Sequence, residues 1–278
     1  MPVDHYENFP VASVLIPKRQ RPAVEALYAF ARGADDVADE GEAEPVARLA
    51  ALNDYRRGIN AIDLGETPTD PLFGRLAGVV RDYRLNTLLL RDLLDAFSQD
   101  VVKKRYADFG ELRDYCHHSA DPVGRLMLQI FDADTAQHRA WSDQICTSLQ
   151  LINFWQDVAI DWKKGRIYLP QDEMQRFRVS ESQIEEARVD AAWRALMAFE
   201  VERARALMLS GAPLATALTG RFGWELRLVV QGGLRILQAI EAVGYDVFQH
   251  RPTLGTGDWA RLLWRAVLMR SRKRDETS

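Results

Sequence analysis

The chain has 278 residues, of which 47% are hydrophobic and 27% are charged, and its formal net charge is −4. This length and apolar content allow a large buried core. The slightly acidic balance lacks the basic footprint that nucleic-acid binding requires, so we expect no nucleic-acid partner.

Helical periodicity runs through nearly the whole chain, with almost no strand signal and no internal repeat. Apolar residues recur at spacings of three and four, and Gly and Pro separate the segments. The predicted helices cover residues 21–40, 45–60, 72–84, 86–106, 109–119, 124–131, 135–163, 180–210, 214–243 and 258–270. The helix from 180 begins with a capping box, Ser180 to Gln183. We therefore predict a single all-α domain over residues 1–278, with helices that wrap a central cavity.

Three oxygen-bearing side chains interrupt the otherwise apolar helix predicted near residues 149–162. Asn153, Asp157 and Asp161 lie four residues apart, so they form one stripe on a helix. A helix that is apolar on nearly all other sides is expected to be buried, and buried carboxylates need a counter-charge or a cation. Oxygen ligands suit Mg²⁺. The alternative is that both aspartates face water and pair with Lys or Arg.

A second group of acids lies near the end of the first predicted helix. Asp35, Asp36 and Asp39 are three and four residues apart, so they share one face. Arg32, one turn earlier, is suited to bidentate binding of phosphate. One such cluster is weak evidence, because acidic helix ends are common. Two clusters on separate apolar helices could hold Mg²⁺ around a diphosphate and stabilise it as a leaving group.

These motifs resemble those of the head-to-head trans-prenyltransferases, the family of squalene, dehydrosqualene and phytoene synthases. The similar stretches are Tyr28-Ala-Phe-Ala-Arg32 with its three aspartates, Asn153 to Asp161, Gly165-Arg166-Ile167-Tyr168-Leu169-Pro170, residues 95–106, Tyr115-Cys116 and residues 244–248. The resemblance covers nearly the whole chain. It implies an isoprenoid-synthase helical bundle around a deep hydrophobic cavity.

The resemblance also implies roles for individual residues. The metal ligands would be Asp35, Asp36, Asp39, Asn153, Asp157 and Asp161. The diphosphate would be bound by Arg32 and Arg166, and by Asn8, which stands where the family usually has serine. Apart from the resemblance, we expect Arg251 to reach the diphosphate from the C-terminal loop. Tyr28 and Tyr115 would lie near the reacting carbons, with Asn153 and Gln156 also in the catalytic site.

Some departures from the family pattern point to one branch. Gln156 precedes the second-motif Asp157 where relatives often carry Arg, and the sequence around Asn8 and Phe154-Trp155 resembles the hydroxysqualene synthases of bacterial hopanoid pathways. The implied reaction converts presqualene diphosphate and water to hydroxysqualene and diphosphate, with Mg²⁺ and without NADPH. On this interpretation Gln156 suits a substrate with one diphosphate; the alternative is that it packs outward.

Other functions remain open at this stage. One alternative is a related enzyme that condenses two farnesyl or geranylgeranyl diphosphates head-to-head. Another is a catalytically silent helical partner, although two intact acidic motifs argue against it. His117 and His118 could orient a water molecule or serve the structure alone.

Cysteine usage and hydropathy suggest a cellular setting. Cys116 and Cys146 form no CxxC or metal-ligand pattern, which favours a reduced, cytoplasmic environment. No apolar run reaches the ~18–20 residues that span a bilayer, and no secretory signal is evident. The basic run at residues 270–274 predicts either a solvated chain end or weak contact with an anionic membrane surface. On the second interpretation the protein would make transient contact with the inner membrane or with pathway enzymes.

Overall fold

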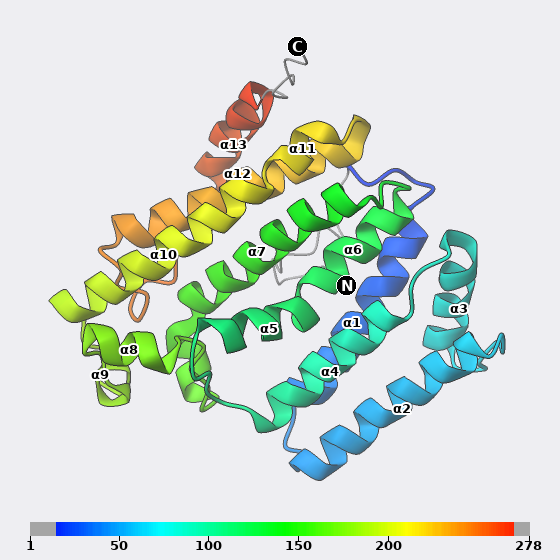
Figure 1. Cartoon of the computed structure of the whole chain (residues 1–278), viewed down its shortest axis with the longest axis horizontal. Helices are drawn as coiled ribbons and strands as arrows, with labels where there is room; N and C mark the ends of the chain where they lie inside the picture. The colour runs from blue at the N-terminus through cyan, green and yellow to red at the C-terminus, as the bar shows by residue number, and fades with distance from the viewer. Residues whose placement is uncertain (1–14, 270–278) are drawn as a thin grey trace.

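The computed structural model describes residues 15–269, without the side chains of Thr256 and Ala260, and within them it contains thirteen α-helices and no strand (Figure 1). The helices are α1 (Arg21–Asp39), α2 (Pro45–Asp63), α3 (Pro71–Tyr83), α4 (Leu88–Val102), α5 (Phe109–Ser119), α6 (Asp121–Ile130), α7 (Ala136–Lys163), α8 (Gln171–Phe177), α9 (Glu181–Glu185), α10 (Ala191–Gly211), α11 (Pro213–Ala217), α12 (Gly220–Ala242) and α13 (Thr256–Leu268). The predicted all-α class is confirmed.

Three of the predicted helices are wrong in extent, and α8 was not predicted. Ser180 does cap a helix by accepting from the backbone N–H of Gln183, but α9 lasts only five residues. Asp190 then caps a separate helix, α10, by accepting from the N–H of Trp193. The predicted helix 214–243 divides into α11 and α12, where Gly220 adopts a φ of 68°. The Asp190 cap thus starts a new helix where the apolar periodicity of the sequence continues, and the positive φ of Gly220 marks the start of α12.

The predicted helix 86–106 also ends earlier, at Val102. The following segment is extended, and its carbonyls accept backbone hydrogen bonds from the segment after α7. Ile167 donates to Lys104 over 3.0 Å and Gln171 donates to Tyr106 over 2.9 Å. These backbone bonds place residues 166–168 beside the C-terminal end of α4.

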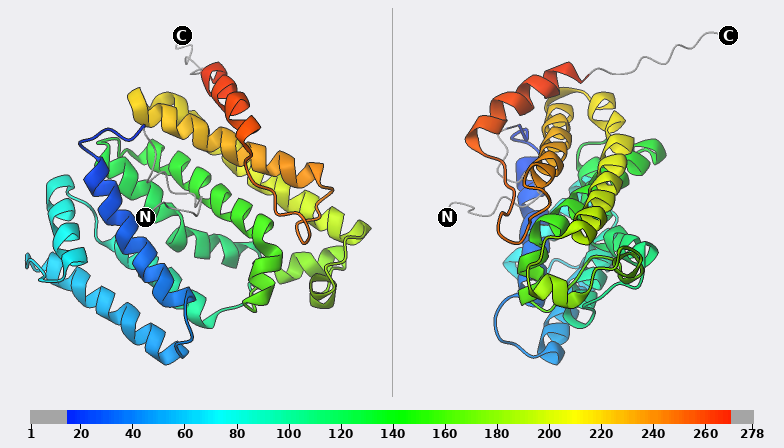
Figure 2. Two further views of the ribbon diagram at one scale, coloured as in Figure 1. Left: turned by 180° about the vertical axis from the view of Figure 1, so that it is seen from behind. Right: turned by 90° about the vertical axis from the view of Figure 1, so that its left-hand side faces the viewer.

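The hydrophobic core is divided into two clusters. One cluster joins α1 to α4 and part of α6; the other joins α5 and α7 to α12. Phe131, after α6, stacks on Phe222 of α12 with ring centroids 3.9 Å apart, and Phe222 packs against both clusters. Figure 2 shows α1 (dark blue) towards one side of the molecule and α10 and α12 (yellow to orange) towards the other.

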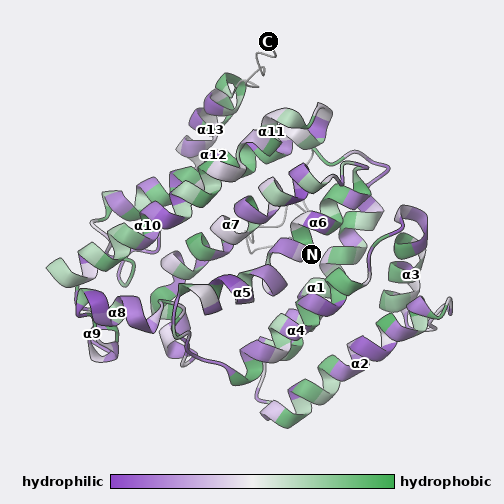
Figure 3. Cartoon of the chain, in the orientation of Figure 1, coloured by the Kyte–Doolittle hydropathy of each residue, from purple (hydrophilic) through white to green (hydrophobic). Residues whose placement is uncertain are grey.

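This division separates the two acidic helices. α1 packs mainly on α2, α3 and α4, whereas α7 packs on α6, α10, α12 and α5. α7 is not uniformly apolar: polar and hydrophobic residues alternate along it (Figure 3), and Ile160 is 44% exposed. The expectation that its non-acidic faces are all buried is therefore wrong at its C-terminal end. Because α1 and α7 belong to different core clusters, contacts between their acidic motifs must be made by side chains that cross from one cluster to the other.

Candidate active site

The first-motif acids divide between two directions on α1. Tyr28, Arg32, Asp35 and Asp39 lie within one narrow stripe at helical spacing, and Asp36 lies to one side of it. Arg32 is paired with Asp36 over 2.8 Å and lies 3.5 Å from Asp35. The two aspartates are 44% and 38% exposed at their side chains, so these charges remain accessible.

Asp39 links α1 to the turn that follows α7. Its carboxylate accepts two hydrogen bonds from Arg166, one of 2.9 Å to the guanidinium Nη1, and Lys164 lies 3.2 Å away. Burial raises the pKa of Asp39, but hydrogen bonding and charge from Arg166, followed by Lys164, bring it below its ordinary value. We call Asp39, Lys164 and Arg166 the α1 group. Lys164 had no role assigned from the sequence.

Arg166 has an unused donor at this point. Its side chain is buried, and its Nε has no hydrogen-bond partner among the residues that the structure describes. A buried donor without a partner is costly. A phosphate oxygen beside Arg166 would satisfy it, because a guanidinium binds phosphate with two N–H groups at once.

The second motif forms a half-buried stripe on α7, as its spacing predicts. Asn153, Asp157 and Asp161 are each half-buried. Arg251 binds Asp157 through two hydrogen bonds, one of them 3.1 Å from Nη2, and we call this pair the α7 group. Burial first, and then the charge of Asp157, raise the pKa of Asp161 to about 7. The alternative left open by the sequence, that both aspartates face water and pair with Lys or Arg, holds only in part: Asp157 pairs with Arg251, but both aspartates are half-buried.

Gln156 is buried and does not pack outward. Its side-chain amide donates to the carbonyl of Pro252 over 2.6 Å. Together with the Asp157–Arg251 pair, this bond ties α7 to the loop between α12 and α13. Arg251 lies 94 residues after Asp157 in the sequence. The bond from Gln156 to Pro252, the neighbour of Arg251, holds this part of the loop beside Asp157.

An aromatic cluster adjoins the α1 group. Phe154 stacks on Tyr168 with centroids 3.7 Å apart, and Tyr115 and Tyr106 pack within 6.1 Å of these rings. Tyr168 follows Arg166 by two residues, so the aromatic cluster lies directly beside the Arg166 side of the α1 group. Tyr115 lies in this cluster, and its role near the reacting carbons stays a prediction. Tyr28 is half-buried on α1.

Asp100 is a site residue that the sequence reasoning missed. It lies near the end of α4, is only 6% exposed, and accepts from the hydroxyl of Tyr115 over 2.7 Å and from that of Tyr168 over 3.4 Å. Burial raises its pKa to about 6, against the lowering effect of Arg166. The available signal was an acid on the same face as Leu93 and Phe97, where the helical pattern calls for an apolar residue.

Some other expectations concern residues outside the described part of the chain or away from this site. Asn8 and the basic run 270–274 belong to the part of the chain that the structure does not describe. His117 contacts the buried Asp121 over 3.1 Å, and His118 contacts the carbonyl of Asp114 over 2.9 Å. Both histidines therefore have local partners on α5 and α6, as their structural interpretation predicts.

The oxygen donors present fit Mg²⁺ with additional ligands from a substrate. Within residues 15–269, no three His, Cys, Asp or Glu side chains are close enough together to hold a metal ion. Mg²⁺ in proteins is commonly bound by one or two carboxylates, with waters and substrate phosphates as the remaining ligands. Asp157 and Asp161, close enough for one charge to raise the pKa of the other, are a carboxylate pair of this kind.

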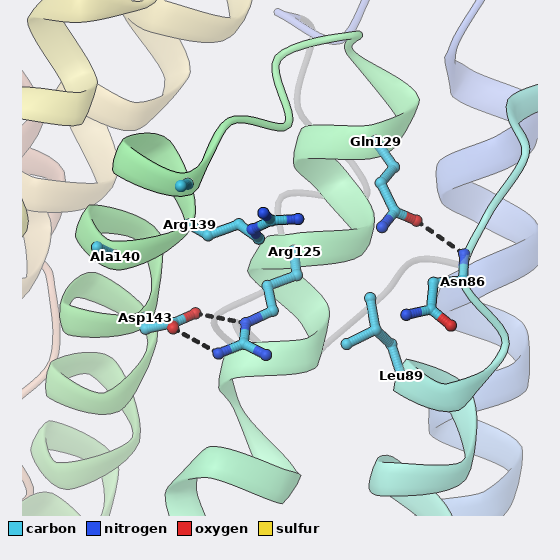
Figure 4. A pocket seen from close by; sticks show the side chains of 8 residues that line it. Asn86, Leu89, Arg125, Gln129, Arg139, Ala140 and Asp143 are labelled. Atoms are coloured by element: carbon cyan, nitrogen blue, oxygen red, sulfur yellow. Dashed lines mark hydrogen bonds and ion pairs between the residues drawn. The ribbon is translucent and has the colours of Figure 1, made fainter.

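A cavity of about 360 Å³ lies away from these residues (Figure 4). It is lined by Asn86, Leu89, Arg125, Gln129, Ala136, Arg139, Ala140 and Asp143. Its most prominent contact is the ion pair of Arg125 with Asp143, which has two hydrogen bonds of 2.9 and 2.7 Å. No residue of the α1 or α7 group borders it.

Comparison with known proteins gives a family. The family model described as squalene/phytoene synthase matches residues 3–258. The chain belongs to the squalene/phytoene synthase family. Among the described helices of this family member, none is long and apolar enough to cross a bilayer.

Several relatives within the family are similar along much of the chain. The hydroxysqualene synthase of Zymomonas mobilis is 41% identical over 174 residues, which make up 61% of this chain and about half (56%) of that protein. The hydroxysqualene synthase of Rhodopseudomonas palustris is 32% identical over 84% of this chain and 80% of its own length. The 15-cis-phytoene synthase of Synechococcus elongatus is 29% identical over 95% of this chain and 88% of its own length.

Solved structures agree with the fold. The squalene synthase HpnC from Alicyclobacillus acidocaldarius superimposes with a TM-score of 0.81 at 38% identity, covering 87% of this chain and 90% of the other. A dehydrosqualene synthase in complex with a ligand superimposes with a TM-score of 0.82 at 24% identity, covering 94% and 90%. The expected isoprenoid-synthase helical fold is therefore confirmed.

Proposed function

We propose that this protein is a hydroxysqualene synthase. In this reaction presqualene diphosphate and water give hydroxysqualene and diphosphate, with Mg²⁺ and without NADPH. The observation that carries the substrate class is the arrangement of the α1 and α7 groups, in which three cationic side chains converge on the motif acids. The specific reaction is supported by similarity to the two hydroxysqualene synthases.

The cations of the two groups would exchange their carboxylate partners for phosphate oxygens. The Nε of Arg166 has no partner among the described residues, and the side chains of Lys164 and Arg251 are 43% and 46% exposed. As the bond between the substrate carbon and the diphosphate oxygen breaks, negative charge collects on the diphosphate. Donors already aimed at that charge stabilise the transition state more than the ground state.

Bound Mg²⁺, held by acids of both motifs, would neutralise the diphosphate and make it a better leaving group.

The aromatic cluster would act on the carbon skeleton. Loss of diphosphate leaves a carbocation, and the faces of Tyr115, Phe154 and Tyr168 attract positive charge. Their mutual packing also keeps bulk water away until the cation has rearranged. Asp100 holds the hydroxyls of Tyr115 and Tyr168, which fixes the rings in place. Water then adds its oxygen to the carbon and releases one proton, which balances the reaction.

The alternative function is head-to-head condensation of two prenyl diphosphates to presqualene diphosphate, dehydrosqualene or phytoene. It is favoured by the phytoene synthase from Synechococcus elongatus, which matches a longer share of the chain than the hydroxysqualene synthases do. It needs a second diphosphate to be accommodated near Gln156, which carries no charge.

Product analysis distinguishes the two functions. The purified protein, with Mg²⁺ and without NADPH, is given farnesyl diphosphate in one reaction and presqualene diphosphate in another. We expect hydroxysqualene from the second reaction only. Consumption of farnesyl diphosphate in the first reaction would contradict this proposal and favour head-to-head condensation.

Substitution of the motif acids tests the site itself. We expect Asp157→Ala and Asp36→Ala to lower turnover by at least about 100-fold, because each removes charge that positions the diphosphate and its metal. Asp54→Ala, an exposed acid of α2, is the matched control and should retain activity. Circular dichroism should show wild-type helicity in all three variants. Wild-type turnover in Asp157→Ala would refute the assignment of the second motif.

A further inference from the structure

The acids of α1 lie at the end of the helix where negative charge is unfavourable. Asp35, Asp36, Asp39 and Glu40 lie in the last turn or next to it, and the last turn of α1 contains no basic residue. The carbonyl end of a helix carries a partial negative charge, so acids there are repelled and cations are stabilising. The last carbonyls of a helix also lack partners within the helix. A cationic donor from outside α1 would therefore stabilise this turn.

Arg48 of α2 is this donor. Its guanidinium donates to five backbone carbonyls at the end of α1 and in the loop that follows. Nη1 donates to Val37, Ala38 and Glu40 over 3.1, 2.9 and 2.9 Å, Nη2 donates to Gly41 over 2.7 Å, and Nε donates to Ala43 over 2.8 Å. The rigid fork of a guanidinium carries five N–H groups, so one arginine can bind several carbonyls at once. Arg48 thus caps the C-terminal end of α1 from the neighbouring helix.

The bound carbonyls flank Asp39 on both sides. Two of them belong to the residues directly before Asp39 and two to the residues directly after it. The carboxylate of Asp39 in turn accepts from Nη1 of Arg166 over 2.9 Å, across 127 residues of sequence. Because an aspartate side chain is short, its direction follows the backbone that carries it. A shift of the last turn of α1 would therefore move this carboxylate relative to Arg166, and small displacements in a site can be costly.

We infer that Arg48 is a positioning residue for the α1 group. It holds the last turn of α1 so that Asp39 faces Arg166 and, on the proposed function, the metal diphosphate. Arg48 binds backbone carbonyls and acts through Asp39. The inference rests on the proposed function for the identity of the ligand, whereas the contact of Arg48 with α1 does not depend on it.

Hydrogen exchange of the full-length protein without ligand tests whether Arg48 holds this turn. In Arg48→Gln we expect the amides of residues 37–40 to exchange at least about tenfold faster than in the wild type, because the turn frays when its carbonyls lose their donor. The amides of residues 24–30, in the same helix, are the internal reference and should keep their rates. Arg75→Gln is the matched control, since this exposed arginine of α3 donates to Pro71 of its own helix. Unchanged exchange at residues 37–40 in Arg48→Gln would overturn the inference, and so would equally faster exchange along all of α1.

Calorimetric binding of Mg²⁺ with inorganic diphosphate tests whether the effect passes through Asp39. We expect Arg48→Gln to weaken the affinity at least about fivefold in the wild-type background and less than about twofold in an Asp39→Asn background, because coupled residues do not act additively. Equal losses in both backgrounds would overturn the positioning role, since a purely structural residue would weaken both proteins alike. Absence of binding by the wild type would instead contradict the proposed function, and exchange at residues 37–40 would still show whether Arg48 holds the end of α1.

Discussion

At the scale of single residues, the motif acids are paired with cations that suit a diphosphate. Asp39 is bound by Arg166 and Lys164, and Asp157 is bound by Arg251. Asp39 and Asp157 were expected to bind metal and the two arginines to bind phosphate, whereas Lys164 joins Asp39 without a role predicted from the sequence. An incoming metal diphosphate carries both partners, so it can replace each ion pair without leaving a buried charge uncompensated.

The buried carboxyl of Asp100 should make the free energy of unfolding depend on pH. Burial raises its pKa from 3.8 to about 6, so the folded state holds the proton more tightly than the unfolded state. The wild type therefore loses stability as pH rises from about 4 through 6, whereas Asp100→Asn has no charge to bury. We expect the unfolding free energy of the variant, relative to the wild type, to increase by up to about 3 kcal/mol between pH 4 and pH 7.

Urea unfolding at the two pH values measures this difference. Asp54→Asn, at an exposed position on α2, is the control and should show no such increase. A constant difference between Asp100→Asn and the wild type at pH 4 and pH 7 would mean that Asp100 does not hold its proton in the folded protein.

At the scale of helices, α7 depends on close packing against α10. A Cβ added at Gly211 would lie 2.5 Å from the carbonyl oxygen of Trp141 and 2.6 Å from Ile145. Ser148 of α7 also donates to the carbonyl of Ala204 over 2.7 Å. These contacts fix the rotation of α7 and therefore the direction of its Asn153, Asp157 and Asp161 stripe.

Gly211→Ala should lower the free energy of unfolding by about 1–3 kcal/mol, because a backbone carbonyl cannot move aside as a side chain can. The control is Gly78→Ala in α3, where a Cβ would meet no atom within 4 Å. There we expect a gain of about 0.5–1 kcal/mol from higher helix propensity. Denaturant unfolding of the two variants measures both effects. Equal stability of Gly211→Ala and the wild type would show that α7 and α10 can separate without loss.

At the scale of the whole molecule, the two core clusters carry one acidic helix each. The α1 group joins them, because Asp39 belongs to the first half and Lys164 and Arg166 follow α7 in the second. A ligand that binds both motifs would therefore connect the two halves more firmly. Such a ligand should therefore raise the free energy of unfolding of the whole molecule.

Thermal unfolding with Mg²⁺ and inorganic diphosphate tests this connection. At a ligand concentration of 100 times Kd, binding adds about 2.7 kcal/mol to the stability of the folded state. For a chain of this size we expect Tm to rise by roughly 5–10 °C. Mg²⁺ alone should give a smaller shift, and Asp157→Ala should lose the effect of the combination. An undiminished shift in Asp157→Ala would place the ligand elsewhere.

The amino-acid sequence by itself determined the all-α class, most of the helices and the two acidic stripes. All of these follow from spacings within a few residues, and helical geometry converts such spacings into faces. The misplaced ends, such as those near residues 106 and 190, occur where long-range backbone bonds or a new cap replace local periodicity. The proposed roles of the motif acids remain predictions.

Only the tertiary structure decided which partners those acids have. Lys164 and Arg166 reach Asp39 across more than 120 residues, Arg251 reaches Asp157 across 94, and Asp100 gathers the hydroxyls of two tyrosines. Local periodicity predicts which face of a helix a residue occupies but not which residues that face contacts. Those contacts depend on how the helices pack, and the packing depends on the buried side chains of the whole chain together.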